Sequence, residues 1–316
     1  GEDPTALALQ ARAAELLGQE AARFVPTGTM ANQLALLCQC ERGQEVLVGE
    51  GNHVMFYESG AGAAWAQVQF SVVGQGGLFT AAEVAAAIKP LEYHHPQSVL
   101  VAIENTHNRS GGRIFPDADL RAIVREAHQR GLRVHVDGAR LWNAAVARGK
   151  APSELVAGVD SVSACFSKGL GAPAGSVLAG SAELIARARR YRKMLGGGMR
   201  QVGVLCAAAL YALEHHRERL AEDHDNAKRL AEGLANMAHV ACEPRNVETN
   251  IVVFDVADSA QAFVRAAAER GVRLNAIGER RVRAVTHLDV SRAQIEQALG
   301  VLSGITKGAG SNSTRA

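Results

Sequence analysis

The chain has 316 residues, of which 47% are hydrophobic and 21% charged, and its formal net charge is +2. This length allows two domains of ordinary size, and the composition is that of a globular protein with a large core. So small a net charge gives no electrostatic reason to expect binding to nucleic acid or to a membrane surface.

The five cysteines show no CxxC spacing, and their number is odd. Three lie in strongly apolar runs, so we expect buried free thiols in a reducing compartment, the cytoplasm, and no metal site. The longest apolar run, 204–213, is too short to span a bilayer and predicts a core helix. Because the chain begins with Gly1 rather than Met, further residues are expected in front of it.

The first elements in the chain surround a turn that could hold an anion. A helix is predicted over 4–17, and a short strand over 22–25 leads through a turn with Gly28 and Thr29 to an apolar helix over 32–40. A strand, a Gly/Thr turn and a helix point free backbone N–H groups at an anion, which makes Gly28 and Thr29 candidates for phosphate binding. A plain turn is the alternative and, for one glycine alone, the more frequent one.

Later strands also end in polar side chains. A strand over 45–48 precedes His53 and Tyr57, which lie in an aromatic cluster, and a β-branched strand ends at Asp137, with Arg140 close behind it. The carboxyl ends of strands are where α/β proteins bind their ligands. A surface histidine with satisfied hydrogen bonds is the alternative for His53.

An apolar strand over 160–166 delivers Lys168 to a glycine-rich turn that contains Pro173 and Gly175. At a buried strand end, desolvation disfavours the charged form of the amine, which makes it available as a nucleophile. A lysine that extends out of the strand end into solvent is the alternative. Asp137 precedes Lys168 by the length of one connection and one strand, so both should lie at the same edge of a sheet.

Strands and helices alternate over 22–180, which predicts an α/β fold with a mainly parallel, doubly wound sheet and helices on both faces. A helix over 218–238 should lead to a small α+β domain. The predicted division is a large domain over 1–217, a small C-terminal domain over 218–303 and a disordered tail over 304–316.

Together the strand ends offer a phosphate cradle, a histidine, a carboxylate with an arginine, and a lysine. This set suits pyridoxal 5′-phosphate, because a lysine can bond to its aldehyde while a carboxylate keeps the pyridine nitrogen protonated. Each feature is weak alone, and together they are fairly specific. A nucleotide-dependent oxidoreductase is the rival from another class, but 169–175 lacks the GxGxxG spacing and follows a lysine.

These residues and their neighbours closely resemble the L-threonine aldolases, pyridoxal-phosphate enzymes of fold type I in the β-eliminating lyase group. The resemblance runs from residue 2 to about residue 303. Its matching stretches are 26–32, 104–108, 136–140, 167–171, 196–201 and 285–289. It implies a fold of the pyridoxal-phosphate-dependent transferase type. The implied reaction is retro-aldol cleavage of L-threonine, L-allo-threonine and related β-hydroxy-α-amino acids to glycine and an aldehyde.

The resemblance also implies a role for each candidate residue. Lys168 would carry the cofactor, Asp137 would hold its pyridine nitrogen, and His53 would stack on its ring. The remaining roles are phosphate binding by Gly28, Thr29 and Arg200, binding of the substrate carboxylate by Arg140 and Arg283, a position beside the substrate for Tyr57, and a second active-site histidine, His94. Whether His53, His94 or a held water removes the proton of the substrate hydroxyl stays open.

The resemblance implies a cytoplasmic homotetramer built from two dimers. It also implies a preceding N-terminal segment that contributes a serine to carboxylate binding. Three enzymes of the same cofactor class would share the lysine and the aspartate: an aminotransferase, a β-eliminating lyase and a glycine hydroxymethyltransferase. The last alternative is a truncated homologue that folds without catalysing.

Overall fold

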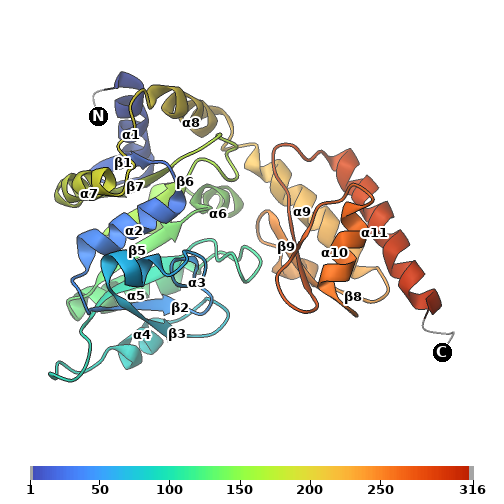
Figure 1. Ribbon diagram of the computed structural model, residues 1–316, viewed down its shortest axis with the longest axis horizontal. Coiled ribbons are helices and arrows are strands. Elements are labelled where there is room, and N and C mark those ends of the chain that lie inside the picture. Colours follow the sequence, from blue (N-terminus) through green and yellow to red (C-terminus); the bar gives the residue numbers. More distant parts are fainter. Residues whose placement is uncertain (1–2, 313–316) are drawn as a thin grey trace. The chain divides into compact units, whose positions relative to one another are not determined.

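The computed structural model describes residues 3–312, with side chains for residues 3–306. The chain divides into two compact units (Figure 1). The first unit runs up to Arg109 and resumes over Ile114–Glu218, and the second comprises Ser110–Arg113 and the chain from Arg219 onwards. The short piece Ser110–Arg113 contacts the second unit, where the hydroxyl of Thr249 donates a hydrogen bond of 2.8 Å to the carbonyl of Gly112.

The first unit is built on a seven-stranded sheet that is parallel except for β7. This confirms the predicted mainly parallel α/β fold. The connection over 166–175 is too short for a helical crossover, which takes a dozen residues or more, so β7 returns antiparallel to β6. In spatial order the strands are β1 (Ala21–Val25), β7 (Ser176–Gly180), β6 (Ser161–Cys165), β5 (Arg133–Gly138), β4 (Ser98–Glu104), β2 (Glu45–Gly49) and β3 (Gln69–Val73).

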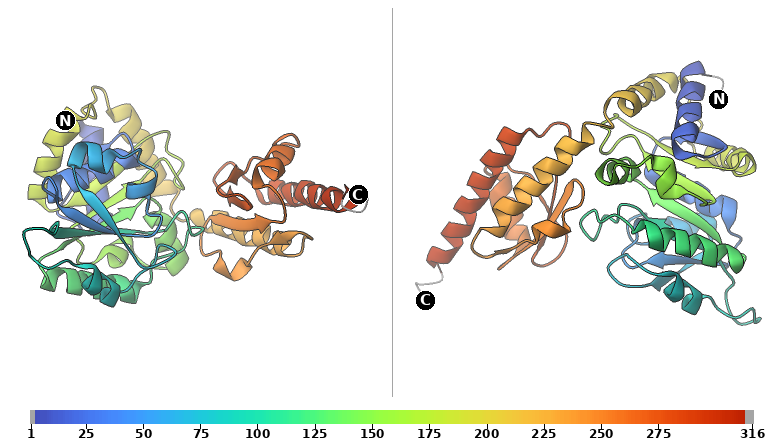
Figure 2. Two further views of the ribbon diagram at one scale, coloured as in Figure 1. Left: turned by 60° about the horizontal axis from the view of Figure 1, so that its bottom comes forward. Right: turned by 180° about the vertical axis from the view of Figure 1, so that it is seen from behind.

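Helices cover both faces of this sheet (Figure 2). They are α1 (Pro4–Leu17), α2 (Gly28–Gln39), α3 (His53–Phe56), α4 (Ala81–Ala87), α5 (Asp117–Gln129), α6 (Leu141–Arg148), α7 (Ala182–Met194) and α8 (Gly203–His215).

Local sequence explains the helix ends. Asp3 accepts hydrogen bonds from the first turn of α1, and Gly18 ends that helix with φ 63°, a conformation that glycine adopts at little cost. Thr27 accepts from the backbone N–H of Met30, so α2 begins at Gly28 and not at Asn32 as predicted. The sequence did not predict the exposed edge strand β3 or the short helix α6.

A buried carboxylate joins three neighbouring strands, β2, β3 and β4, near the edge of the sheet where they begin. Glu45 accepts hydrogen bonds from Ser98 at 2.7 Å, from Gln69 at 3.0 Å and from Ser71, and it pairs with Lys89. Although burial acts in the opposite direction, these partners lower the pKa of Glu45 to about 2.

The second unit packs three helices against a four-stranded antiparallel sheet of spatial order β10-β11-β9-β8. The helices are α9 (Leu220–Ala235), α10 (Ala260–Ala268) and α11 (Arg292–Asn312), and the strands are β8 (Val240–Ala241), β9 (Ile251–Val256), β10 (Asn275–Ala276) and β11 (Arg281–Val285). Helix α11 continues to Asn312, whereas a disordered tail was predicted from residue 304. Leu302 and Ile305 pack on the core of this unit and Thr306 is buried, which extends the helix. Residues 313–316 lie outside the described chain.

Among residues 3–312, every helix is too short or too polar to cross a lipid bilayer.

Candidate active site

Lys168 lies in the connection between β6 and β7, three residues beyond the end of β6. The turn around it is held by backbone hydrogen bonds from Gly171 to the Lys168 carbonyl at 2.9 Å and from Phe166 to the Gly175 carbonyl at 3.0 Å. A Cβ on Gly175, whose φ is 106°, would lie 2.3 Å from the ring of Phe24, so only glycine fits. The half-buried Lys168 side chain is therefore presented from a well-supported turn.

Asp137 is the next-to-last residue of β5, the strand next to β6, and its carboxylate is buried. One oxygen accepts from the side-chain amide of Asn32 at 2.8 Å and the other from the backbone N–H of Ala139 at 3.1 Å. Hydrogen bonds of this kind favour the ionised form of a carboxylate. Lys168 and Asp137 thus meet at one edge of the sheet, at the carboxyl ends of adjacent strands.

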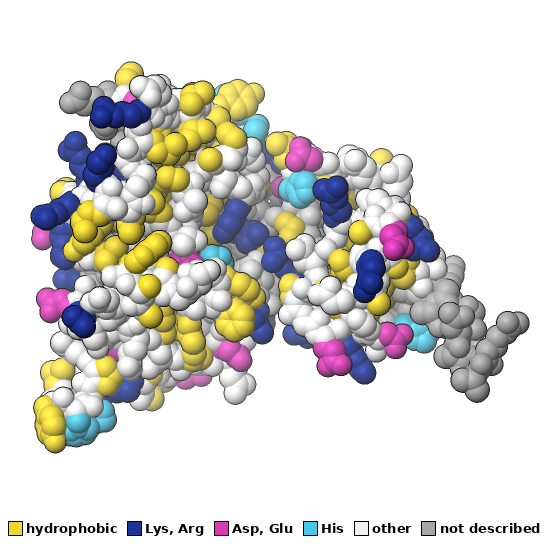
Figure 3. All heavy atoms as spheres, in the orientation of Figure 1, with side chains coloured by type: hydrophobic (Ala, Val, Ile, Leu, Met, Phe, Trp, Pro, Cys, Tyr) yellow, Lys and Arg dark blue, Asp and Glu magenta, His cyan; other side chains and the backbone are white. Residues whose placement is uncertain are grey.

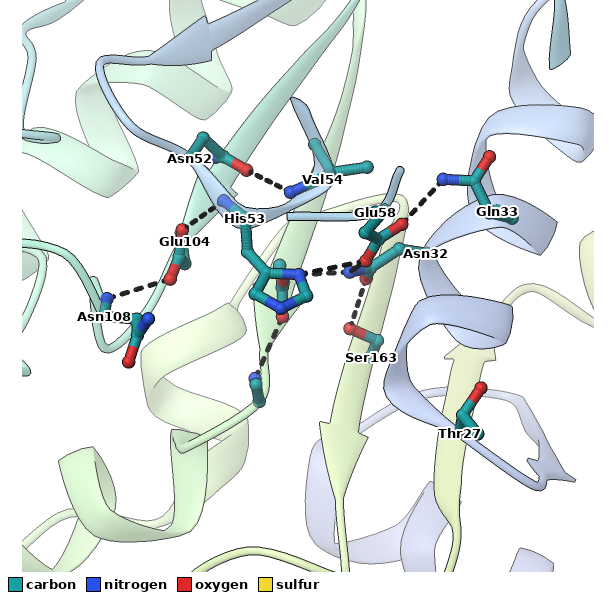
Figure 4. A network of polar contacts seen from close by, with 12 residues as sticks. Thr27, Asn32, Gln33, Asn52, His53, Val54, Glu58, Glu104, Asn108 and Ser163 are labelled. Atoms are coloured by element: carbon teal, nitrogen blue, oxygen red, sulfur yellow. Dashed lines mark hydrogen bonds and ion pairs between the residues drawn. The ribbon is translucent and has the colours of Figure 1, made fainter. Parts of the chain in front are cut away.

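Asn32 of α2 joins Asp137 to a second buried carboxylate, Glu58 (Figure 4). Its amide nitrogen donates to Glu58 at 2.9 Å as well as to Asp137. Its amide oxygen accepts from the hydroxyl of Ser163 at 2.9 Å and lies 3.3 Å from the Nε2 of the buried His135. Two carboxylates on one side and a hydroxyl donor on the other determine which way the amide points.

His53 begins α3 and meets Glu58 through its ring. Its Nδ1 lies 3.1 Å from a Glu58 oxygen, and one polar atom each of His53, Glu58 and Asp137 lies within 4.8 Å of the other two. The hydrogen bond with Glu58 raises the pKa of His53, while burial and the Lys168 charge act against it. The histidine and the two carboxylates therefore form one cluster, beside the strand end that leads to Lys168.

Glu104, at the end of β4, binds the backbone next to this cluster at two positions. Its two oxygens accept from the backbone N–H groups of His53 at 2.7 Å and of Asn108 at 2.9 Å (Figure 4). The side chain of Asn108 in turn accepts from the guanidinium of the buried Arg140 at 3.5 Å. Burial, together with the nearby charge of Asp137, raises the pKa of Glu104. Glu104 therefore connects the position of His53 with that of Arg140.

Gly28 and Thr29 lie in the first turn of α2, where backbone N–H groups lack partners within the helix. A Cβ on Gly28 would lie 2.9 Å from the sulfur of Cys165 at the end of β6, so the glycine lets α2 approach the strand that leads to Lys168. The start of α2 and the Lys168 turn therefore lie together, as an anion site beside the lysine requires.

Tyr57 lies next to His53, with the two ring centroids 5.7 Å apart. The hydroxyl of Tyr57 accepts from Arg109 at 3.4 Å, and the Arg109 guanidinium lies 4.4 Å from the ring centroid of Phe56. This aromatic and cationic group is exposed at the side of the cluster.

Three predicted site residues are not placed against this cluster within the described chain. Arg200 is exposed in the segment between α7 and α8. That segment reaches the start of α2, because a Cβ on Gly197 would lie 2.4 Å from the sulfur of Met30. His94 lies in the exposed loop between α4 and β4, which projects at the lower left of Figure 1. Its side chain contacts Glu92 and His95 of the same loop. Arg283 lies on β11 of the second unit.

Sequence reasoning missed four residues of the cluster: Asn32, Glu58, Glu104 and Ser163. Asn32 could have been noticed as a polar residue inside an otherwise apolar helix, and Glu104 as a carboxylate that ends an apolar strand. Two further histidines, His107 and His135, lie near these residues. Both are buried, and burial lowers the pKa of each to about 4.

Comparison with known proteins matches this chain to one protein family and, over nearly its whole length, to individual proteins. The model of the family described as beta-eliminating lyase matches residues 1–259. The low specificity L-threonine aldolase of Escherichia coli K12 is 44% identical over 300 residues, which cover 94% of this chain and 88% of that protein. The low-specificity L-threonine aldolase 1 of Arabidopsis thaliana is 39% identical over 308 residues, which cover 95% and 86%. A solved structure of a threonine aldolase from Leishmania major superposes with a TM-score of 0.80 at 20% identity, covering 96% of this chain and 89% of that one.

Proposed function

The chain belongs to the beta-eliminating lyase family, and we propose that it is a pyridoxal-phosphate-dependent lyase that cleaves L-threonine, L-allo-threonine and related β-hydroxy-α-amino acids to glycine and an aldehyde. The observation that carries this proposal is the meeting of Lys168 and the buried Asp137 at the ends of adjacent strands, with His53 beside them. The names of relatives that are 39–44% identical over nearly the whole chain supply the substrate class.

The residues present fit the cofactor. Lys168 would hold its aldehyde carbon, Asp137 its pyridine nitrogen, and the first turn of α2 with Gly28 and Thr29 its phosphate. Arg200 would add a charge to the phosphate site, because its segment contacts α2. When bound, pyridoxal 5′-phosphate supplies an electron sink for the bond that breaks.

The other residues bind and orient the substrate. Arg140 and Arg283 would bind the carboxylate of the amino acid, because a planar guanidinium can donate two parallel hydrogen bonds to it. Fixing the carboxylate sets which bond at Cα is aligned for cleavage. His53 would exchange a proton with the substrate hydroxyl, with Tyr57 beside it. His94 or a held water are the other candidates for this step.

We further infer a cytoplasmic homotetramer made of two dimers. Large apolar side chains stay exposed on the first unit, over α8 and around α2 in Figure 3. Among them are Leu7, Met194, Met199, Val204 and Tyr211. Contiguous exposed apolar surface of this kind is typical of a protein contact. The exposed loop with Leu91, Tyr93 and His94 would reach a neighbouring copy in such an assembly. All five cysteines are free thiols, as expected in a reducing compartment.

The first test is the absorption spectrum of the purified protein, followed by an acetaldehyde assay with L-threonine and L-allo-threonine. We expect a visible cofactor band, its loss on borohydride reduction with a mass increase on the peptide that contains Lys168, and formation of acetaldehyde and glycine. A keto acid in place of acetaldehyde would instead indicate an aminotransferase or a β-eliminating lyase.

The variant Lys168→Ala tests the central residue. We expect it to lose the borohydride-dependent mass increase and to retain no measurable aldehyde formation, because the covalent attachment of the cofactor and the nucleophilic amine disappear together. Lys193→Ala, in an exposed part of α7, is the control and should behave as the wild type. Undiminished turnover in Lys168→Ala would refute the assignment.

A further inference from the structure

Glu58 has several hydrogen-bond partners beside the candidate site but no role in the proposed function. Its side chain is fully buried, and it accepts from Gln33 at 2.7 Å and from Asn32 at 2.9 Å, with the Nδ1 of His53 at 3.1 Å. The element that carries it is short and exposed: Phe56, Tyr57 and Ser59 around it all face solvent. Figure 4 shows Glu58 reaching inward between the ring of His53 and helix α2.

We propose that Glu58 is a positioning residue for His53, whose carboxylate keeps the neutral ring protonated on Nδ1 and leaves Nε2 as the atom that takes up or releases a proton. This inference rests on the proposed function, since it concerns the state of the histidine in that reaction.

The hydrogen-bond inventory determines the tautomer. An ionised carboxylate only accepts, so the ring nitrogen that faces Glu58 must carry a hydrogen. The pKa of Glu58 is raised, chiefly by burial and also by the charge of Asp137, while three donors, His53, Gln33 and Asn32, act in the opposite direction. Because both side-chain amides point their N–H groups at it, the site is built for the charged carboxylate. With Nδ1–H held by Glu58, the neutral imidazole keeps its lone pair on Nε2.

The charges around His53 come from four elements. Glu58 follows α3, Asp137 is the next-to-last residue of β5, Glu104 ends β4 and binds the His53 backbone, and Lys168 follows β6. Lys168 alone among these opposes protonation of the ring, and Glu58 is the one in hydrogen-bond contact with it. Removing the charge of Glu58 should therefore lower the pKa of His53 more than any other single change around the ring.

Asn32 makes this arrangement compatible with the cofactor site. The carboxylates of Glu58 and Asp137 both face the same amide nitrogen, which donates to each. The amide thus lies between the two carboxylates and donates one hydrogen bond to each. Through it, the carboxylate that holds the histidine and the carboxylate assigned to the pyridine nitrogen are fixed relative to one another.

The test follows the protonation of His53 directly. Diethyl pyrocarbonate modifies neutral imidazole, so the rate of modification of the His53 peptide, measured by mass spectrometry from pH 5 to pH 9 on the intact holoenzyme, gives its titration midpoint. We expect a wild-type midpoint above 6.5, the ordinary value for histidine. A wild-type midpoint at or below 6.5 would overturn the proposal without need of any variant.

Glu58→Gln removes the charge but keeps an oxygen that can accept from Nδ1–H. We expect its midpoint to fall by about one pH unit, so that His53 is modified about fivefold faster one unit below the wild-type midpoint. Glu58→Asp keeps the charge and should fall by less than half as much. Equal falls in both variants, or an unchanged midpoint in Glu58→Gln, would show that the carboxylate does not set the state of the ring.

Glu92→Gln is the matched control, since it removes a carboxylate that faces His94, 3.4 Å from it, and should leave the midpoint of His53 unchanged. The borohydride and acetaldehyde assays on the same samples separate the two proposals. A cofactor band and aldehyde formation with an unshifted His53 would refute the role of Glu58 alone. Their absence in the wild type would refute the proposed function, while the midpoints would still report on the histidine.

Discussion

Two buried carboxylates, Asp137 and Glu58, lie on either side of a single amide group, and the charge of Asp137 contributes to the raised pKa of Glu58. Sequence could identify Asp137, because a carboxylate after a β-branched strand stands out. It could not identify Glu58, which follows three exposed residues and looks like surface. Its burial depends on α2 and α3 meeting in space, and the spacing of residues along the chain does not contain that information.

The variant Asn32→Asp isolates the part that the amide plays. The aspartate has nearly the same shape and still accepts from Ser163, but it replaces two donated hydrogen bonds by a charge next to Asp137 and Glu58. Since Asp137 must be ionised to hold a protonated pyridine nitrogen, we expect cofactor affinity to fall about tenfold or more, a loss of at least about 1.4 kcal/mol. This affinity is measured by titrating the cofactor-free protein with pyridoxal 5′-phosphate and following the visible absorption band.

Gln33→Glu is the matched control for this change. It also places a carboxylate against Glu58, at 2.7 Å, but Asp137 accepts from Asn32 and Ala139 and not from Gln33. Cofactor affinity should therefore stay within about twofold of the wild type, which is well under 1 kcal/mol. Equal losses in the two variants would mean that Asn32 acts through Glu58 alone.

At the level of elements, the sequence predicted the strands that carry the site, but it did not predict how helix α2 packs against them. Alternating strands and helices over 22–180 correctly indicated a parallel sheet, so the ends at Asp137 and Lys168 could be expected at one edge. Helix α2 was placed too late, because Gly28 and Thr29 look like turn residues, whereas the Thr27 cap starts the helix directly before them. The close approach of α2 to β6 depends on Gly28 and Cys165, which are far apart in the chain.

Gly28→Ala tests this close approach. Alanine favours a helix over glycine by up to about 1 kcal/mol, so the helix itself should not suffer. Its Cβ would lie 2.9 Å from the sulfur of Cys165 and should push the first turn of α2 away from the Lys168 turn. We expect cofactor affinity to fall about tenfold, corresponding to about 1.4 kcal/mol, with little change in the thermal midpoint.

The double variant Gly28→Ala with Cys165→Ala provides the control. Removing the sulfur makes room for the new methyl group, so cofactor affinity should recover most of the loss, and the two changes should be strongly non-additive. Additive losses would show that the glycine acts in another way, for instance through the freedom of the turn.

For the molecule as a whole, the sequence and its resemblance predicted the class of fold and the cofactor chemistry. Lys168, Asp137 and Gly28 each lie in a short stretch whose pattern can be recognised without knowledge of the rest of the fold. His94 and Arg283 could be named only by resemblance. His94 lies on an exposed loop and Arg283 in the second unit, so their roles depend on the arrangement of whole units and copies rather than on local sequence.

The proposed assembly can be tested by changing α8, which carries apolar residues on its solvent-exposed side as well as on its buried side. Val204 is 75% exposed and Tyr211 60% exposed in the single chain, although α8 has a buried face of its own that includes Cys206 and Leu213. A solvent-facing helix surface normally carries charged residues, so this face is expected to be covered by another copy.

We expect Val204→Lys to weaken that contact. Burying a valine contributes about 1.5–3 kcal/mol, and a lysine at the same position would have to leave its charge in an apolar contact, so association should weaken at least tenfold. Analytical ultracentrifugation over a range of protein concentrations would then show smaller species than the wild type forms at the same concentrations. Gln261→Lys, an equal charge change at an exposed position of α10, serves as the control and should leave the assembly intact. If Val204→Lys sediments as the wild type at every concentration, the exposed face of α8 lies outside the subunit contacts, and the apolar side chains around α2 become the surface to test next.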